Sequence, residues 1–316
     1  MRYGHPFTRR AALLAATAAL AIGAAAPTRA ETILRIANAG EPKSLDPHKV
    51  SGTWENRIVG DMFVGLTTED ATGATVPGAA TAWEVSEDGK VYTFTLRAHS
   101  WGDGTPVTAD DFVFSLRRIL DPATAAQYAS LLYPIRNAEP LNSGKMTGME
   151  NLGVRAIGRG TLEITLENPT PYFIDQLTHY TSFPVPRHLV EAKGNDWVKP
   201  GTIVGNGPYT VTEWTPNTQI VMTKNPSWWD AASVAIDKVI FFPAEERNAA
   251  TRQFRAGEID IQYDFASEQI DFLKANLPDE TRIAPYLGIY YYPINLTRKP
   301  FDDRRVREAL SMAIDR

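Results

Sequence analysis

The sequence predicts an α/β protein in which a mainly antiparallel unit is inserted into a unit of mixed strands and helices. Residues 236–242, 245–256 and 259–263 follow one another in the order strand, helix, strand, which is typical of α/β architecture. Residues 66–180 instead carry short runs of β-formers separated by turn residues. The Pro-Val-Pro run at 184–186 marks the boundary, because proline suits neither a helix interior nor a central strand.

Local patterns define the other elements. Residues 33–38 alternate apolar and polar side chains as a half-buried strand does. Residues 91–97 (VYTFTLR) show the clearest alternation of β-formers. The remaining expected elements are helices at 54–63 and 124–132, a loop at 138–151, and a hairpin of strands 152–157 and 162–167 across the turn at 158–160.

The loop and helix at residues 101–122 have the strongest helix-start signal. Turn residues at 102–106 (GDGTP) lead to Thr108, which suits an N-cap. Asp110 and Asp111 then fall in the first turn, where the helix dipole favours negative charge. The apolar stripe that follows at helical spacing comprises Phe112, Val113, Leu116, Ile119 and Leu120, and Pro122 ends the helix.

Residues 1–30 are typical of an export signal. Arg9 and Arg10 precede the apolar stretch 11–26, which is short and alanine-rich for a membrane span. In Thr28-Arg29-Ala30, small residues stand at the positions that the peptidase of exported proteins requires, which predicts cleavage after Ala30. The paired arginines fit a twin-arginine signal, and an ordinary secretory signal is the alternative. Either signal places the mature chain in the periplasm.

The amino-acid composition argues against disulfide bonds, a lipid anchor and a nucleic-acid partner. The chain has no cysteine, so it has neither disulfides nor a lipid-anchoring cysteine at the cleavage site. Removing residues 1–30 takes away four arginines and no acid, so the net charge changes from −5 to −9. An acidic surface argues against a nucleic-acid partner, which needs a basic patch.

Motifs for catalysis and metal binding do not occur. The sequence has no G-x-S-x-G, no H-E-x-x-H and no phosphate loop, and no two of its five histidines are three or four residues apart. We therefore expect no cofactor, no metal and no enzymatic activity. A hydrolase assembled from distant residues stays open as an alternative.

Five blocks in order carry a family resemblance: SLDPH at 44–48, GDGTPVTADDFVFS at 102–115, GNGPYTVTEW at 205–214, RAGEID at 255–260 and PFDDRRVREAL at 300–310. On these blocks the chain resembles extracytoplasmic solute-binding protein family 5. The nearest branch is that of the oligopeptide-binding proteins of bacterial ABC importers. The resemblance covers nearly the whole mature chain.

The resemblance implies a three-lobed periplasmic binding protein fold of type II, with mixed sheets and helices. Lobe I would comprise 31–65 and 185–285, and lobe II 66–184. Residues 286–316 would form a hinge-crossing strand and the start of a truncated lobe III. We therefore expect this 316-residue form to bind peptides weakly or not at all, since one wall of the cleft would be missing, and a complete chain to bind them. We also expect the aromatic run at 290–292 to favour aggregation.

The function implied by the resemblance is capture, not catalysis. Such a protein closes two lobes around an extended oligopeptide and passes the peptide to an inner-membrane ABC permease. Main-chain pairing supplies affinity that every peptide sequence shares. We expect a monomer. The ligand-binding residues carried over position by position are Ser51, Gly52, Thr53, Tyr128, His179, Tyr263, Asp264, Phe265, Tyr286 and Tyr291.

Two positions depart from the oligopeptide pattern: Ser51 stands where an acid is expected, and Asp264-Phe265 replaces a pair of amides. Other interpretations stay open. Aromatic residues in strand patterns usually pack in a core, and Ser51-Gly52-Thr53 alone resembles an ordinary turn. A receptor of the same fold could take a metal chelate, haem or an oligosaccharide, and a periplasmic hydrolase or chaperone is the distant alternative.

Overall fold

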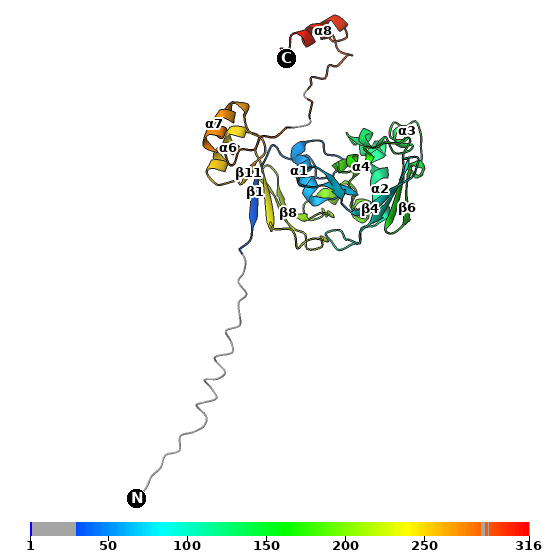
Figure 1. Ribbon diagram of the computed structural model, residues 1–316, viewed down its shortest axis with the longest axis horizontal. Helices are drawn as coiled ribbons and strands as arrows, with labels where there is room; N and C mark the ends of the chain where they lie inside the picture. The colour runs from blue at the N-terminus through cyan, green and yellow to red at the C-terminus, as the bar shows by residue number, and fades with distance from the viewer. Residues whose placement is uncertain (2–29, 286–287, 290, 316) are drawn as a thin grey trace. The chain divides into compact units, whose positions relative to one another are not determined.

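The computed structural model describes residues 1, 30–285, 288–289 and 291–315 (Figure 1). The chain divides into two compact units, Met1–Phe265 and Ala266–Arg316. Each unit is described by itself.

A five-stranded mixed sheet joins the two ends of the first unit. Its strand order is β11 (Ile261–Gln262), β1 (Ile33–Asn38), β10 (Lys238–Pro243), β9 (Gln219–Lys224) and β8 (Tyr209–Thr215). β1 runs parallel to both β10 and β11, whereas β10, β9 and β8 pair antiparallel. The first strand of the chain to be described, β1, therefore lies between two of the last strands of this unit, β10 and β11.

The predicted strand, helix and strand of residues 236–263 are confirmed, with shorter limits. β10 leads into α6 (Arg247–Arg255) and then into β11. Gly257 follows the helix with a φ of 73°, and the N–H groups of Gly257 and Glu258 bond to the carbonyls of Phe254 and Gln253. Glycine adopts this left-handed conformation without a Cβ clash, which is why the helix ends here.

A second sheet is wholly antiparallel, with the order β4 (Ala80–Val85), β5 (Val91–Leu96), β7 (Thr161–Thr165) and β6 (Val154–Gly158). The predicted strand at 91–97 and the predicted hairpin at 152–167 are thus confirmed. Alternate residues of β5 and β7 are buried, as a sheet with one covered face requires. A small pair of strands, β2 (Thr67–Glu69) and β3 (Thr75–Pro77), precedes this sheet.

Helix α2 (Ala109–Leu120) covers this sheet (Figure 1). Its start matches the predicted cap: the Thr108 backbone N–H donates to Asp111 Oδ2 at 2.8 Å, and Thr108 Oγ1 donates to the same oxygen at 2.9 Å. The predicted apolar stripe is buried, with Phe112, Leu116 and Ile119 almost completely inaccessible. The other helix predicted in this half, at 54–63, is α1 (Thr53–Met62).

Two predictions between residues 121 and 151 are wrong. The helix expected at 124–132 is instead two short 3₁₀ turns, η1 (Pro122–Thr124) and η2 (Ala129–Leu132), because Ala125 adopts a left-handed conformation with a φ of 53° between them. The loop expected at 138–151 contains two short helices, α3 (Ala138–Asn142) and η3 (Met149–Asn151), and buried Leu141 anchors the first of them.

The remaining short elements of the first unit are α4 (Phe173–Gln176), η4 (Tyr180–Ser182), α5 (Arg187–Lys193) and η5 (Gly194–Val198).

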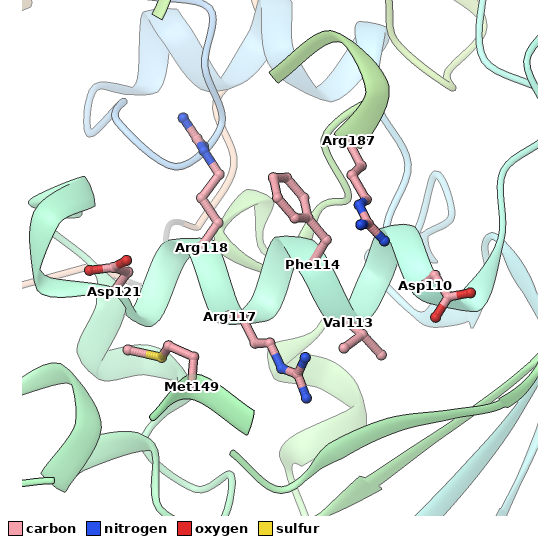
Figure 2. Close-up of a pocket in the computed structure, with 8 residues that line it drawn as sticks. All are labelled: Asp110, Val113, Phe114, Arg117, Arg118, Asp121, Met149 and Arg187. Atoms are coloured by element: carbon pink, nitrogen blue, oxygen red, sulfur yellow. The ribbon is translucent and has the colours of Figure 1, made fainter. Parts of the chain in front are cut away.

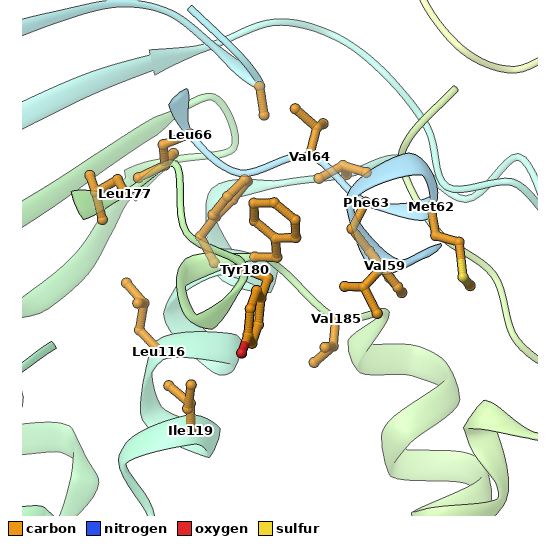
Figure 3. Close-up of a cluster of buried hydrophobic side chains, with 14 of the residues drawn as sticks. Val59, Met62, Phe63, Val64, Leu66, Leu116, Ile119, Leu177, Tyr180 and Val185 are labelled. Atoms are coloured by element: carbon orange, nitrogen blue, oxygen red, sulfur yellow. The ribbon is translucent and has the colours of Figure 1, made fainter. Parts of the chain in front are cut away.

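One continuous hydrophobic core runs beneath both sheets. It includes Ile36 of β1, Phe94 of β5 and Phe241 of β10. Figure 3 shows the part where the end of α1 and the following segment meet residues of α2 and the stretch after residue 177. The antiparallel sheet is therefore packed into the same core as the mixed sheet.

The GNGPY block connects β8 to the end of α1. Asn206 binds both backbone groups of Val64, with its Oδ1 accepting from the N–H at 3.1 Å and its Nδ2 donating to the carbonyl at 3.1 Å. The Gly207 N–H donates to the Met62 carbonyl at 2.8 Å. A Cβ on Gly205 would lie 1.9 Å from that same carbonyl oxygen, so only glycine fits.

The SLDPH block forms a buried polar network with α2. Arg118 donates to Asp46 through both terminal nitrogens, at 3.0 and 2.6 Å, and also to His48 Nδ1 at 2.8 Å. His48 Nε2 therefore carries the hydrogen and donates to the Phe183 carbonyl at 3.1 Å. Burial opposes ionisation of Asp46, but the hydrogen bond from Arg118 holds its pKa below the ordinary value. Burial lowers the pKa of His48 to about 4.

The second unit contains η6 (Ser267–Gln269), α7 (Ile270–Asn276) and α8 (Arg304–Met312). Asp303 caps α8 by accepting from the Arg305 N–H at 2.9 Å. The predicted aromatic strand is wrong for Tyr291 and Tyr292, which lie in irregular backbone; Tyr290 is outside the described residues. β11 is the last strand among the described residues, and aromatic side chains alone do not make a strand without a paired neighbour.

Replacing Gly205 with Ala tests the close approach to α1. We expect Gly205→Ala to lower the free energy of unfolding by about 1–3 kcal/mol or more, because the methyl group must displace the Met62 carbonyl. Gly60→Ala is the matched control. Gly60 lies in α1 with open space around it, so this change should raise stability by up to about 1 kcal/mol. Equal effects in urea titrations of the two variants would contradict the assignment.

Acid titration tests the His48 network. The unfolded histidine gains a proton below about pH 6.5 but the folded one only below about pH 4, so unfolding becomes easier as the pH falls through this window. His48 should account for about 3 kcal/mol of the stability lost between these limits. His48→Gln should flatten the dependence of the free energy of unfolding on pH relative to the parent chain. An unchanged slope would show that His48 titrates normally.

Candidate functional site

Glu55 organises the loop that contains Ser51 and Gly52. Its Oε2 accepts from the backbone N–H groups of these two residues at 3.0 and 2.8 Å, and its Oε1 accepts from the Lys43 N–H at 2.9 Å. The side chain is buried, with 2% of its surface exposed. A buried carboxylate with three N–H donors is held rigidly, because releasing any donor would leave charge unsatisfied.

Gly52 is required at its position by close contact. A Cβ there would lie 2.6 Å from the indole of Trp54. Gly52 is also the residue before α1, with Glu55 three positions later in the pattern of a capping box. That spacing is the signal in the sequence from which the role of Glu55 could have been predicted, and the sequence analysis missed it.

Ser51, Tyr128 and His179 come together from three distant segments. The Tyr128 hydroxyl donates to the Ser51 carbonyl at 3.4 Å. The Tyr128 and His179 rings meet edge to face with centroids 5.9 Å apart, and His179 packs on Tyr180 at 4.0 Å. Tyr128 is 39% exposed, so this cluster lies at the surface.

His179 is a neutral group at physiological pH. Burial lowers its pKa to about 4. Its Nδ1 accepts from the Thr181 backbone N–H at 3.3 Å, which leaves the other ring nitrogen as the hydrogen-bearing one. His179 therefore offers a flat aromatic surface and a neutral donor, not a cation for binding carboxylates.

Tyr263 and Asp264 are each held by an arginine. The Arg57 guanidinium lies 3.9 Å from the centre of the Tyr263 ring, a cation–π contact. Asp264 forms an ion pair with Arg247 at 2.7 Å. Tyr263 is 48% exposed and Phe265 is half-buried.

Two of the predicted site residues, Thr53 and Asp264, line one concavity, whereas Ser51, Tyr128, His179 and Tyr263 are not among its lining residues. A cavity of about 250 Å³ is lined by Thr53 and Trp54 at the start of α1, by Gln262 at the end of β11 and Asp264 after it, and by residues at the end of β1, after β10 and in α6. Those three strands are parallel, so their carboxyl ends meet at one edge of the sheet. Open α/β sheets bind ligands at this edge.

The last two predicted site residues, Tyr286 and Tyr291, are not part of the first unit. Tyr286 lies outside the described residues. Tyr291 is 71% exposed and belongs to the second unit, so it is assigned to neither group of residues. Arg57, Arg247 and Gln262 are site residues that the sequence analysis missed; Arg57 is one turn after Thr53 and could have been found from helical spacing.

A different pocket lies beside α2 (Figure 2). It has a volume of about 370 Å³ and contains none of the predicted site residues. Two of its arginines are already paired, Arg118 with Asp46 and Arg187 with Glu191. Its lining residues are Asp110, Val113, Phe114, Arg117, Arg118, Asp121, Met149 and Arg187.

In the described part of the chain, no three histidine or acidic side chains are grouped so that they could hold a metal ion. None of the described helices combines the length and the apolar character needed to cross a membrane.

Glu55→Gln tests the organisation of the loop. Glu55 Oε2 accepts from Ser51 and Gly52, and Oε1 accepts from Lys43, but glutamine keeps only one acceptor oxygen. Its amide nitrogen must face an N–H donor on one side or the other, so the loop should loosen and the Ser51 and Gly52 amides should exchange with solvent deuterium about tenfold faster or more. The Ile58 amide inside α1 is the internal reference and should be unchanged. Glu69→Gln, at an exposed glutamate of β2, is the control variant and should leave all three amides as they were. Unchanged protection of the loop would contradict the role of Glu55.

Comparison with known proteins identifies the family. Residues 74–316 match the family described as bacterial extracellular solute-binding proteins, family 5 Middle. The chain is 43% identical over 312 residues to the periplasmic oligopeptide-binding protein OppA of Salmonella typhimurium, covering 96% of this chain and 57% of the relative. It is 42% identical over 279 residues to the periplasmic murein peptide-binding protein MppA of Escherichia coli, covering 87% of this chain and 51% of that protein.

The fold is also shared with solved structures. The crystal structure of Haemophilus influenzae OppA in complex with RPPGFSPFR matches with a TM-score of 0.88 and 37% identity, over 91% of this chain and 56% of that one. This chain thus spans little more than half the length of the relatives it matches. The expected fold of mixed sheets and helices is confirmed. The chain belongs to family 5 of the bacterial extracellular solute-binding proteins.

Proposed function

We propose that this protein is the substrate-binding subunit of an ABC importer and captures oligopeptides in the periplasm. One observation carries the proposal: Thr53, at the end of the loop that Glu55 holds, and Asp264, after β11, line one concavity at the carboxyl ends of three parallel strands. Relatives whose names specify peptide binding share the fold.

The geometry suits recognition of a peptide main chain. Glu55 fixes the backbone of the loop, and extended backbone can pair with an extended guest through groups common to all peptides. Lobe I at 31–65 and 185–285, lobe II at 66–184 and the crossing segment at 286–316 would close around that guest. A monomer would then deliver the peptide unchanged to an inner-membrane permease, without catalysis.

We further propose that the protein reaches the periplasm by a signal peptide cleaved near Ala30. The paired arginines at positions 9 and 10 and the apolar stretch that follows support export. No cysteine is present to carry a lipid, so the mature protein would diffuse freely.

Identification of co-purifying ligand tests the function. The full-length protein is purified, unfolded and analysed by mass spectrometry. We expect intact peptides of mixed sequence, since main-chain pairing does not select side chains. A metal chelate, haem or an oligosaccharide would contradict peptide capture in favour of another ligand, and cleaved peptides would indicate a hydrolase.

A variant test locates the binding site. Titrating tri- to pentaalanine calorimetrically should show binding that Glu55→Gln weakens about tenfold, because the loop must then be ordered on binding. Glu69→Gln should bind as the parent protein does. Equal affinity in all three proteins would place the peptide elsewhere.

A further inference from the structure

Arg57 lies next to residues that line the concavity. It lies four residues after Thr53 on α1, so the two side chains share one face of the helix. Thr53 lines the cavity, and so does Asp264, the neighbour of the Tyr263 on which Arg57 stacks. The guanidinium therefore lies between α1 and the segment after β11, the two regions that contribute Thr53 and Asp264 to the cavity.

Within the described part of the chain, Arg57 forms no ion pair. The adjacent carboxylate, Asp264, is already paired with Arg247 at 2.7 Å. Asp61, one turn further along α1, is only partly ionised near neutral pH, because burial raises its pKa to about 7. A half-buried guanidinium stays charged at any physiological pH and gains from a carboxylate partner.

Two contacts hold the Arg57 side chain in place. The exposed Tyr263 ring supports one face of the guanidinium at 3.9 Å. Asn38 Oδ1 accepts from Arg57 Nη1 at 3.4 Å, and buried Asn38 is itself held by donating from Nδ2 to the Trp54 carbonyl at 3.0 Å. A cation positioned before binding loses little side-chain freedom when an anion arrives.

We propose that Arg57 makes this site prefer oligopeptides that carry an aspartate or glutamate at the position lying over Tyr263. The preference rests on the proposed function as a peptide-binding protein. The ligand carboxylate would accept hydrogen bonds from the outer nitrogens of the guanidinium, while the stacked face remains on the tyrosine. Main-chain pairing would still supply affinity for all peptides, so the acidic residue adds selectivity at one position.

The experiment compares glutamate with glutamine along a peptide. Tetraalanine is substituted with Glu or Gln at each position in turn, and binding to the full-length protein is measured calorimetrically. We expect one position at which Glu binds about tenfold more tightly than Gln, the range of a partly buried charge pair. Arg57→Gln should remove this difference between the Glu and the Gln peptide. Arg57→Lys should retain part of it, since the charge remains.

Arg35→Gln is the matched control for charge. Arg35 lies on β1 and is ion-paired with Asp260 at 3.5 Å, so this variant loses the same charge without touching the cavity. The preference for Glu should persist in it. If Arg57→Gln and Arg35→Gln lost the preference for the Glu peptide equally, the preference would come from the net charge of the protein and not from Arg57. That result would overturn the proposal. Binding of all peptides with no preference for Glu in the parent protein would overturn the role of Arg57 alone, whereas failure to bind any peptide would overturn the proposed function as well.

Discussion

The parallel pairing of β1 with β10 and β11 is the constraint on which the rest of the structure depends. Strands that run parallel end at the same edge of the sheet, so the loop after Asn38 is brought beside the segments that follow Pro243 and Gln262. Backbone hydrogen bonds fix this arrangement whatever side chains follow the strands. The position of the concavity is therefore a consequence of the sheet topology. The side chains of the loops after the strands determine which chemical groups line it.

Buried polar groups then make those loops rigid. Glu55 binds three backbone N–H groups, Asn206 binds both backbone groups of Val64, and Arg118 joins Asp46 to His48. In a low-dielectric interior such groups are costly to leave unpaired, so each network selects one conformation of the chain around it. A binding surface ordered before the ligand arrives loses less entropy on binding.

Charge pairing distinguishes the arginines near the cavity. Arg247 is committed to Asp264 and Arg118 to Asp46, whereas Arg57 rests on the face of a tyrosine. An aromatic face stabilises a cation but does not neutralise it. The charge of Arg57 is therefore available to a ligand. An arginine that is already ion-paired stabilises the fold, whereas Arg57 can discriminate between ligands.

The sequence by itself determined the elements that depend on neighbouring residues: the strand at 33–38, the capped helix after Thr108, the hairpin across residue 160 and the glycine stop at Gly257. Its ordered blocks also determined the family. The helix expected at 124–132 failed because Ala125, which favours helix by propensity, is held in a left-handed conformation. Only the tertiary structure decided that Thr53 lines the same cavity as Asp264, that His179 packs on Tyr128, and that Glu55 and Arg57 serve the site. Helix caps and hydrophobic periodicity depend on residues that are close in the sequence, so they can be recognised from the sequence alone. Contacts between distant segments depend on the order of the strands in the sheet, which no local pattern encodes.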